Sequence, residues 1–307
     1  MRILIIGGSG FMGSHIVDTF LRHEHDVTVY DLHPEQFRRT PERSSLVVGN
    51  FGNAGALDDL IATGFDVVIH CVSTTTPKTS NESPIFDVQS NVVGTLNLLD
   101  ICVAHKVGKV VFMSSGGTIY GAIGDLPKVD ELRAPNPMCS YAVSKVAIEH
   151  YLEVYKHLRG LDYVSLRVSN PYGERQNPLR ALGALTVFLH RTIRRQEIEV
   201  WGDGSVTRDF IYVGDVAHAV YLAAASSISG IFNVGSGVGL SLRDILSKIS
   251  EVTGLEPTVR WLPARAFDVP RIVLDTSKLR NSTSWHCRTS LSDGIAKTAD
   301  WLRDTRI

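Results

Sequence analysis

A tyrosine and a lysine four residues apart form the pair with the clearest chemical potential in this sequence. Tyr141 and Lys145 open a segment whose apolar residues recur at helical spacing. Residues at i and i+4 share one face of a helix, so the Tyr141 phenol and the Lys145 ammonium can point into one cleft. A free tyrosine has a pKa of about 10, and a nearby positive charge stabilises the phenolate and lowers that pKa. We therefore predict that Tyr141 is a catalytic acid and base, tuned by Lys145.

A glycine-rich loop near the start of the chain predicts a binding site for a dinucleotide. Gly7, Gly10 and Gly13 follow a short apolar run and lead into a helical pattern. Such a loop lets the backbone approach a pyrophosphate, and the N-terminus of the next helix supplies N–H groups. The loop residues expected at the cofactor are Gly7, Gly10, Phe11, Met12 and Gly13.

An acidic residue at the end of the next strand pattern indicates which dinucleotide binds. Asp31 stands eighteen residues after Gly13, where a carboxylate accepts from the ribose hydroxyls and repels a 2′-phosphate. This favours NAD over NADP, and Arg38 and Arg39 would weaken the preference if they folded back. Because ligands of open α/β sheets bind beyond the strand ends, further cofactor contacts are expected at Asn50, Phe51, Cys71 and Val72.

The elements that must position these residues alternate regularly in the first half of the chain. Short apolar runs at 3–6, 27–30, 46–48, 67–70, 110–113 and 164–168 predict buried strands. Helical patterns at 14–22, 56–62, 86–104 and 141–158 fall between them. Strands that alternate with helices are typical of βαβ units. We predict an α/β fold for residues 1–170: a Rossmann-type doubly wound parallel sheet with helices on both faces.

The pattern becomes irregular after residue 170, which predicts a smaller α/β substrate-binding domain at 171–307. Its expected helices are 184–194, 213–225, 242–253 and 291–303, and its expected strands are 198–201 and 231–234. Segments near 210–236 are expected to return to the first sheet. Because the sequence between the lobes is not rich in Pro, Gly and Ser, we expect the lobes to share a cleft.

Composition excludes several classes of function. The chain has 307 residues and a net charge of −1, so no global field favours nucleic acid or an anionic membrane. Its apolar runs are shorter than the about 20 residues that span a bilayer. Four widely spaced cysteines predict reduced thiols in the cytoplasm, without a metal site or a disulfide framework.

Several motifs together resemble a known family. They are the glycine loop, Asp31, the run SSGGTIYG at 114–121, Tyr141 with Lys145, LRVSNPYG at 166–173 and WGDGSVTRDFIYV at 201–213. In combination, and over essentially the whole chain, they resemble the nucleotide-sugar branch of the extended short-chain dehydrogenase/reductases. This is the NAD-dependent epimerase/dehydratase family, and the nearest pattern is that of the UDP-glucose 4-epimerases.

The resemblance implies roles for individual residues. Tyr141 would act at the 4-hydroxyl of the sugar, Lys145 would bind the nicotinamide ribose, and Asn91 would support the cofactor and the active-site helix. Ser114 and Pro171 complete the cofactor contacts that it implies. The substrate contacts that it implies are Ser115, Gly116, Tyr141, Asn170, Trp201, Arg208, Arg265 and Asp268.

The nucleotide part of the substrate accounts for most of those contacts. By resemblance, Asn170, Arg208 and Arg265 would meet the diphosphate, Asp268 the uridine ribose, and Trp201 the uracil, on which a flat ring can stack. Plain alternatives remain, since Trp201 could be a core residue and Arg208 could form a local salt bridge with the adjacent aspartate.

One position departs from the family pattern. The usual serine or threonine partner of the catalytic tyrosine stands four residues before the tyrosine of the YG pair, and here that position is Gly116. Glycine has no hydroxyl to offer. Ser115 or Thr118 would have to supply the hydrogen bond, and the sequence favours neither. The departure leaves the third catalytic residue open.

The expected reaction is epimerisation at C4 of a UDP-sugar, with NAD taking and returning a hydride through a transient 4-keto sugar. Dehydratases and decarboxylases of the family use acidic residues where this chain has Gly116 and Gly117. Another nucleotide-sugar oxidoreduction, or an NAD-binding protein without activity, is the alternative. The sugar is not identified: Lys78, Arg175 and Arg180 could meet a carboxylate or could be solvated surface charges.

Two of the expected helices bear on assembly. The helices at 86–104 and 141–158 carry apolar residues on more than one face, including Val93, Leu96, Leu99, Ile148 and Leu152. Members of the family commonly pair these helices across a two-fold axis. By resemblance we expect a homodimer built through a four-helix bundle.

Overall fold

A seven-stranded parallel sheet forms the larger lobe and confirms the predicted fold class. The structure, a computed structural model, describes residues 1–124, 126–180, 183–264 and 269–305. Within them the strand order is β10-β6-β5-β4-β1-β2-β3. Their bounds are β1 (Arg2–Ile6), β2 (Asp26–Asp31), β3 (Ser44–Val48), β4 (Val67–His70), β5 (Lys109–Ser115), β6 (Asp162–Val168) and β10 (Gly230–Val234). The order reverses between β1 and β4, which creates the crevice where such sheets bind ligands.

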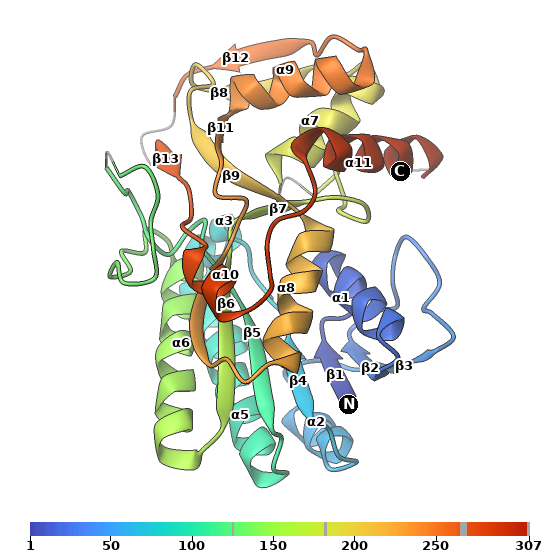
Figure 1. Cartoon of the computed structure of the whole chain (residues 1–307), viewed down its shortest axis with the longest axis vertical. Coiled ribbons are helices and arrows are strands. Elements are labelled where there is room, and N and C mark those ends of the chain that lie inside the picture. The colour runs from blue at the N-terminus through green and yellow to red at the C-terminus, as the bar shows by residue number, and fades with distance from the viewer. Residues whose placement is uncertain (125, 181–182, 265–268, 306–307) are drawn as a thin grey trace.

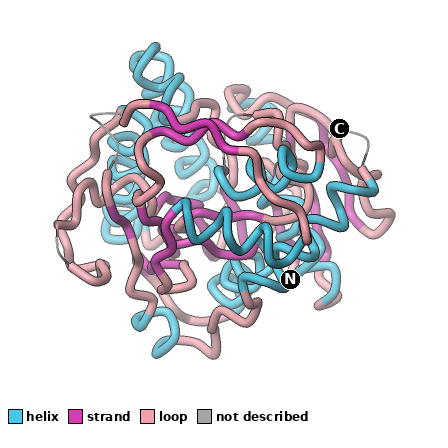
Figure 2. The backbone as a smooth tube through the Cα atoms, turned by 90° about the horizontal axis from the view of Figure 1, so that it is seen from above, coloured by secondary structure: helices cyan, strands magenta, loops and turns pink. Residues whose placement is uncertain are grey.

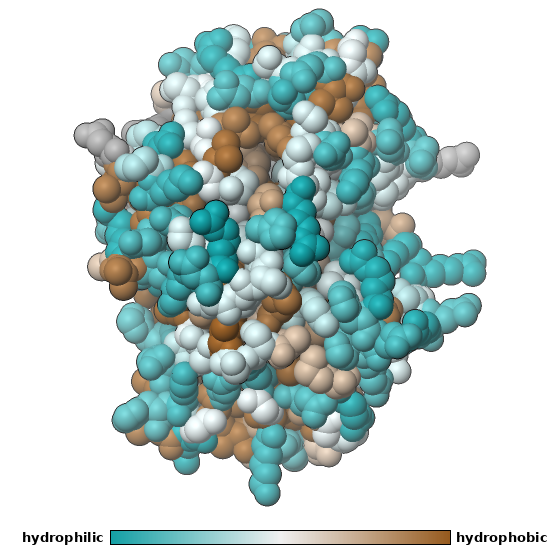
Figure 3. Space-filling model, viewed as in Figure 1, coloured by the Kyte–Doolittle hydropathy of each residue, from teal (hydrophilic) through white to brown (hydrophobic). Residues whose placement is uncertain are grey.

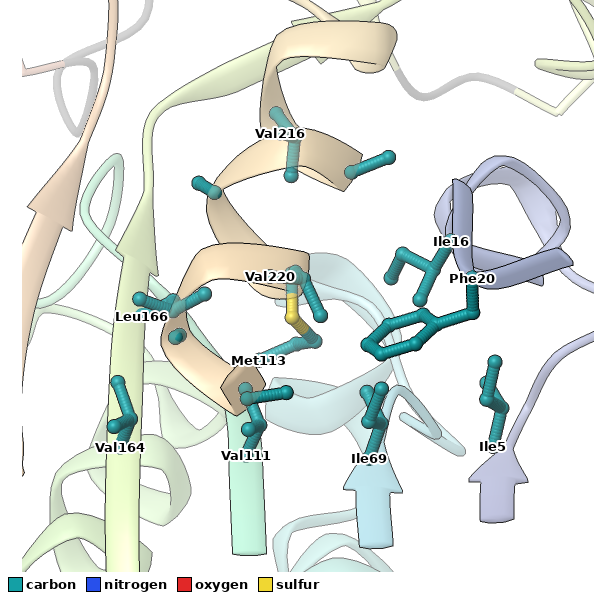
Figure 4. Packing of buried hydrophobic residues seen from close by; sticks show 14 of the residues in the cluster. Ile5, Ile16, Phe20, Ile69, Val111, Met113, Val164, Leu166, Val216 and Val220 are labelled. Carbon is teal, nitrogen blue, oxygen red and sulfur yellow. The ribbon is translucent and has the colours of Figure 1, made fainter. Parts of the chain in front are cut away.

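One face of this sheet packs against α1 (Phe11–Arg22) and α8 (Val213–Ala225). In Figure 4, side chains of four strands meet Ile16 and Phe20 of α1 and Val216 and Val220 of α8. The strands are apolar on both faces because helices cover both, as expected for a parallel sheet. The helix at 213–225 belongs to the segment near 210–236 that was expected to return to the first sheet, and it lies on that sheet (Figure 1).

The opposite face is covered by α2 (Ala54–Ile61), α5 (Gly94–Ala104) and α6 (Ser140–Arg159). Leu99 of α5 and Ile148 and Leu152 of α6 are buried in this layer. The helix α6 begins just before Tyr141 and ends at Gly160, whose positive φ of 70° suits a helix C-terminus. Figure 2 shows the molecule from above, with helices in cyan and strands in magenta.

The second lobe is built from smaller pieces. Its strands are β7 (Asn170–Tyr172), β8 (Ile198–Trp201), β9 (Thr207–Tyr212), β11 (Gly239–Ser241), β12 (Val259–Leu262) and β13 (Arg271–Ile272). Its helices α7 (Ala184–Ile193), α9 (Leu242–Thr253) and α11 (Leu291–Asp304) share one apolar core with strands β8 and β9. In Figure 1 this lobe lies above the sheet, while β10 and α10 (Ser277–Ser282) return to the first lobe. A division of the chain at residue 171 stays a prediction.

The expected helix at 86–104 is more irregular than its pattern predicts. It consists of α4 (Pro84–Asp87), a π-helical segment η1 (Val88–Val93) and α5, and the short helix α3 (Pro77–Glu82) precedes it. A π-helical turn inserts an extra residue in a helix and often lies at a functional site. Here it lies around Asn91.

The surface agrees with the balanced charge of the sequence. On the face shown in Figure 3, hydrophilic residues surround separate apolar patches. In the part of the chain that the structure describes, no helix combines the length and the apolar composition that crossing a membrane requires.

A buried ion pair ties α6 to the sheet. The Arg167 guanidinium on β6 donates to the Glu149 carboxylate on α6 at 2.7 Å, and both side chains are at most 3% exposed. Arg167 also donates to the Tyr120 hydroxyl at 2.9 Å, which in turn donates to Asn233. Removal of one partner leaves an uncompensated buried charge, which is more costly than loss of the whole pair.

We predict that Arg167→Met lowers the free energy of unfolding by about 3–5 kcal/mol, because it leaves the Glu149 carboxylate buried without its cation. Urea denaturation followed by circular dichroism measures the loss. Arg303→Met removes an exposed pair with Asp300 and should cost about 0.5 kcal/mol or less. Equal effects of the two substitutions would contradict the prediction.

Candidate active site

A cavity of about 870 Å³ lies at the reversal point of the sheet. It is bounded by the glycine loop after β1, the end of β2 and the loops after β3 and β4. Eight residues predicted at the cofactor line it: Gly7, Gly10, Phe11, Asp31, Asn50, Phe51, Cys71 and Val72. The structure therefore brings these residues, distant in sequence, around one space.

The glycine loop is tight in a way that only glycine permits. Gly7 has a φ of 85°, in the left-handed region. A Cβ at Gly13 would lie 2.1 Å from the carbonyl oxygen of Gly7, so a side chain there is impossible without moving the loop. Gly13 thus closes the turn rather than lining the cavity, and Met12 packs toward the core.

The carboxylate of Asp31 stands at the wall of this cavity. Its Oδ2 accepts a hydrogen bond from the backbone N–H of Ser9 at 2.9 Å, which fixes it beside the glycine loop. The Arg38 guanidinium is engaged elsewhere, since it binds the carboxylates of Glu35 and Asp18. Burial lowers the pKa of Arg38, but the bonds to the two carboxylates together outweigh it and raise the pKa. Arg39 is exposed.

The structure distinguishes the two hydroxyls, of Ser115 and Thr118, that the sequence left open as partners of the Tyr141 phenol. Hydrogen bonding by the Ser115 side chain lowers the pKa of Tyr141, against the larger effect of burial. The Thr118 hydroxyl donates to the Ser115 hydroxyl at 2.9 Å. Of the two hydroxyls, Ser115 is therefore the one that acts on Tyr141, and Thr118 donates to Ser115.

Lys145 lies beside Tyr141 as the i, i+4 spacing predicts. Its Nζ is 5.5 Å from the centroid of the Tyr141 ring, 4.6 Å from that of Phe112, and donates to the carbonyl of Met113 at 2.9 Å. Burial lowers the pKa of Lys145 to about 8.

The pKa of Tyr141 differs from the expectation that Lys145 lowers it. Burial raises the pKa of Tyr141 to about 12, although the Ser115 hydrogen bond opposes the rise. The ammonium of Lys145 is directed at the carbonyl of Met113, and the protein's own groups therefore hold the phenol in its protonated form at neutral pH.

Gly116 has no space for the side chain that the family pattern has there. A Cβ at this position would lie 2.5 Å from Cδ1 of Leu274 and 2.8 Å from the carbonyl oxygen of Arg167. The neighbouring Gly117 is different, since its nearest atoms, those of Asn170 and Ser169, are 3.7 Å away. Packing against Leu274 thus explains why a hydroxyl is absent at position 116.

A second cavity, of about 390 Å³, lies in the smaller lobe and gathers residues expected at the substrate. Asn170, Trp201 and Arg208 all line it, and Trp201 is 39% exposed rather than part of the core. Pro171, predicted at the cofactor, also lines this second cavity. Arg265 and Asp268 lie outside the residues that the structure describes.

Asn91 and Ser114 are buried and do not line the first cavity. Asn91 accepts from the backbone N–H of Thr74 at 3.0 Å and donates to Thr75 and Asp87. The Ser114 Oγ is buried without a hydrogen-bond partner in the described structure, and so is the Oγ of Ser9 in the glycine loop.

The basic residues that could meet a sugar carboxylate or be surface charges lie in different surroundings. Arg175 lines the first cavity and binds Asp18 of α1 at 2.9 Å, with its side chain only 12% exposed. Asp18 also forms a salt bridge with Arg38. It therefore links the loop after β2, which carries Arg38, to the loop after β7, which carries Arg175. Lys78 is 87% exposed and lies 4.0 Å from Glu82. Nothing in the local sequence distinguishes Arg175 from a surface arginine.

Comparison with known proteins identifies the family. A family model described as "NAD dependent epimerase/dehydratase family" matches residues 3–235. The chain belongs to this family. A UDP-glucose 4-epimerase of Mycolicibacterium smegmatis is 33% identical, with 99% of each chain covered.

Solved structures agree with that membership. The UDP-glucose 4-epimerase of Thermus thermophilus, in complex with NAD, is 36% identical over 100% of both chains, with a TM-score of 0.94. The UDP-glucose 4-epimerase of Thermotoga maritima, with UDP-glucose, is 30% identical over 99% of both chains, also with a TM-score of 0.94. The family resemblance seen in the sequence is therefore confirmed.

The residues of this epimerase/dehydratase family member fit the cofactor named in the family description. The glycine loop approaches the cavity without side chains at Gly7 and Gly10, and Asp31 supplies an acceptor at the cavity wall. The two buried hydroxyls without partners, on Ser9 and Ser114, are polar groups that a bound dinucleotide could satisfy.

We predict that Gly116→Ser destabilises the protein by about 1–3 kcal/mol, because the new side chain overlaps Leu274 and the Arg167 carbonyl. Thermal and urea denaturation measure the loss. Gly117→Ser is the matched control, with ordinary contact distances of 3.7 Å, and its cost should stay near about 0.5 kcal/mol. A larger loss for Gly117→Ser than for Gly116→Ser would refute the steric explanation.

Proposed function

We propose that this protein is a UDP-sugar 4-epimerase of the UDP-glucose/UDP-galactose type that uses NAD. The observation that carries the proposal is the Lys145 ammonium 5.5 Å from the centre of the Tyr141 ring, with Ser115 lowering the pKa of the same phenol by hydrogen bonding. Lys145 is also close to the cofactor cavity, since its charge lowers the pKa of Cys71, a residue of that cavity, against the larger effect of burial.

Proton transfer at the sugar is the task of Tyr141 and Ser115. NAD, when bound, supplies the chemistry of accepting and returning a hydride, and its positive ring favours the Tyr141 phenolate. Tyr141 takes the proton of the 4-hydroxyl and later returns it. Ser115 holds the same oxygen by its hydroxyl, which Thr118 keeps oriented. Lys145 stabilises the phenolate by its charge.

Remote contacts hold the nucleotide while the sugar changes faces. Asn170, Trp201 and Arg208 line one cavity, where an amide, a flat ring and a guanidinium suit a nucleoside diphosphate. Binding energy from this nucleotide serves the reacting centre by retaining the keto sugar between the two hydride transfers. Arg265 and Asp268 are proposed to add contacts to the phosphate and the uridine ribose.

Two observations favour this reaction over its relatives. Dehydratases and decarboxylases of the family use acidic side chains in the segment of Gly116 and Gly117, and a Cβ at Gly116 would overlap Leu274 and the Arg167 carbonyl. Of the three basic residues that could meet a sugar carboxylate, Arg175 is bound to Asp18 and Lys78 is solvated, which leaves Arg180 at the wall of the first cavity. We propose a neutral hexose as the substrate.

We also propose a homodimer in the cytoplasm. Large hydrophobic side chains on α4, η1 and α6 are exposed to solvent. They are Ile85, Phe86, Val88, Val93, Val143, Tyr151, Val154 and Leu158. Leu99, Ile148 and Leu152, which seemed candidates from sequence, pack on the sheet instead. An exposed patch of this kind is typical of an interface. The four cysteines are free thiols, in keeping with a reducing compartment.

We predict that Tyr141→Phe abolishes C4 inversion, with kcat at least about 100-fold below that of the natural chain, because the acid and base is lost. A panel of UDP-sugars is incubated with each protein, and inversion is read by proton NMR. Ser115→Ala should lose more activity than Thr118→Val, because Ser115 acts on the phenol by hydrogen bonding.

Failure of the natural chain to invert any sugar, despite bound NAD, would disprove the epimerase function. Full activity of Tyr141→Phe would disprove the mechanism instead. Equal activity of Ser115→Ala and the natural chain would remove Ser115 from the site.

We predict that the protein sediments as a dimer and that Val154→Arg shifts it toward the monomer, because a guanidinium is placed in an apolar interface. Sedimentation velocity at micromolar concentration measures the change. Leu132→Arg is the control, since Leu132 is 93% exposed and lies outside α6. A monomeric natural chain would contradict the proposed assembly.

A further inference from the structure

Asp87 is a fully buried carboxylate close to the proposed catalytic helix. It ends the short helix α4, its side chain is 0% exposed, and it takes part in none of the ion pairs within the described part of the chain. A buried carboxylate without a cation needs several donors to offset its lost hydration. The structure supplies four.

The four donors come from three different segments. One carboxylate oxygen accepts from the Thr75 hydroxyl and from the Asn91 amide at 3.0 Å. The other accepts from the hydroxyls of Ser144 at 2.6 Å and Ser140 at 3.2 Å. Asp87 therefore joins the loop after β4, the π-helical segment η1 and the helix α6.

The α6 donors flank the catalytic pair. Ser140 directly precedes Tyr141, and Ser144 directly precedes Lys145. The backbone N–H groups of Ser140 and Tyr141 are held as well, by Asn81 Oδ1 at 2.9 Å and Ser80 Oγ at 3.0 Å of α3. The first turn of α6 is thus fixed by side chains of the segment that contains Asp87.

The other two donors lead to the cofactor cavity. Asn91 accepts from the N–H of Thr74, and Thr74 lines the cavity together with Cys71 and Val72. The carboxylate of Asp87 therefore stands between the loop that bounds the cavity and the helix that carries the acid and base.

We propose that Asp87 is a positioning residue for this reaction: its carboxylate holds Tyr141 and Lys145 in register with the loop that bounds the cofactor cavity. The inference rests on the proposed epimerase function. It adds a residue that touches neither substrate nor cofactor but sets the geometry and the electrostatics of both catalytic side chains.

The charge of Asp87 acts on both side chains in the same direction. It raises the pKa of Tyr141, as does Cys139, while Ser115 opposes the rise. It also raises the pKa of Lys145, together with Cys71 and Glu149, against the effect of burial. His70, which lies near Lys145, has its pKa lowered to about 3 by burial and by the ammonium, and is therefore neutral. Loss of the Asp87 charge moves both pKa values down.

The test compares Asp87→Asn, Asp87→Ala and the control Glu153→Gln. Asparagine keeps one acceptor oxygen for Asn91 while the two serine hydroxyls turn to accept from its amide, so it removes the charge with little change of shape. Glu153 is also a carboxylate on α6 that accepts from a hydroxyl, that of Tyr163 at 2.6 Å. It lies twelve residues beyond Tyr141, about 18 Å along the helix.

The kinetic readout separates positioning from binding. Asp87→Ala should lower kcat for C4 inversion by about 100-fold, the cost of a misplacement of about 1 Å, with KM changed by about threefold or less. Asp87→Asn should fall between Asp87→Ala and the natural chain. Both limbs of its pH–rate profile should move to lower pH by about half a unit or more. The reason is that the Asp87 charge, which raises the pKa of both Tyr141 and Lys145, is absent from this variant. Glu153→Gln should leave rate and profile unchanged.

A measurement that does not depend on catalysis distinguishes the Asp87 proposal from the epimerase proposal. Tyrosine labelled with ¹³C at Cζ reports the Tyr141 titration by NMR, and the resonance is assigned by its loss in Tyr141→Phe. Its pKa should be lower in Asp87→Asn than in the natural chain. An inactive natural chain would count against the epimerase proposal alone, since this titration still tests Asp87.

Two results would overturn the inference. One is an Asp87→Asn variant with the rate, pH profile and Tyr141 pKa of the natural chain. The other is a lower rate with neither limb nor the Tyr141 pKa displaced, since that would leave Asp87 a purely structural residue. If Asp87→Ala does not fold, Asp87→Asn alone decides between these results.

Discussion

Burial of Tyr141 and Lys145 is the constraint on which the rest of the site depends. Burial disfavours the charged form of each group, so it raises the pKa of the phenol and lowers that of the ammonium. Both shifts lead away from the phenolate–ammonium pair that the chemistry uses. A water-excluding site strengthens every electrostatic contact made within it, but its neighbours must restore the charged forms.

The fold supplies these neighbours through the side-chain contacts that hold α6 in place. Asp87 holds the first turn of the helix, and Glu149, two turns further, is anchored to Arg167 on the sheet. Both carboxylates raise the pKa of Lys145 and so favour its charged form. The same contacts that place the helix also keep the lysine protonated. For Tyr141, the hydrogen bonding of Ser115 opposes the rise in pKa but does not cancel it, which leaves further activation to positive charge at the cofactor cavity.

Local patterns carry most of what could be predicted from the sequence. The glycine loop, Asp31 and the Tyr141–Lys145 spacing depend on contacts within a few residues or on one strand end, and strands covered on both faces are apolar throughout. Asp87 could not be found in this way, because its partners lie in other elements and a single aspartate is typical of the surface. Arg175 was a candidate for a sugar carboxylate, but the sequence did not indicate its salt bridge with Asp18 of α1. The π-helical segment around Asn91 likewise depends on its long-range bonds to the loop after β4.

The choice between Ser115 and Thr118 shows why spacing alone was insufficient. Both lie within three residues of Gly116, so the sequence favoured neither, whereas the structure ranks them by contact. Leu274 and the carbonyl of Arg167 occupy the space beside Gly116, and these groups come from β6 and from a segment far along the chain. That packing disfavours a side chain at position 116. Ser115, the last residue of β5, is then the hydroxyl that acts on Tyr141. Thr118 then limits the rotation of that hydroxyl by donating to it, so two residues divide the task of orienting and making the bond to Tyr141.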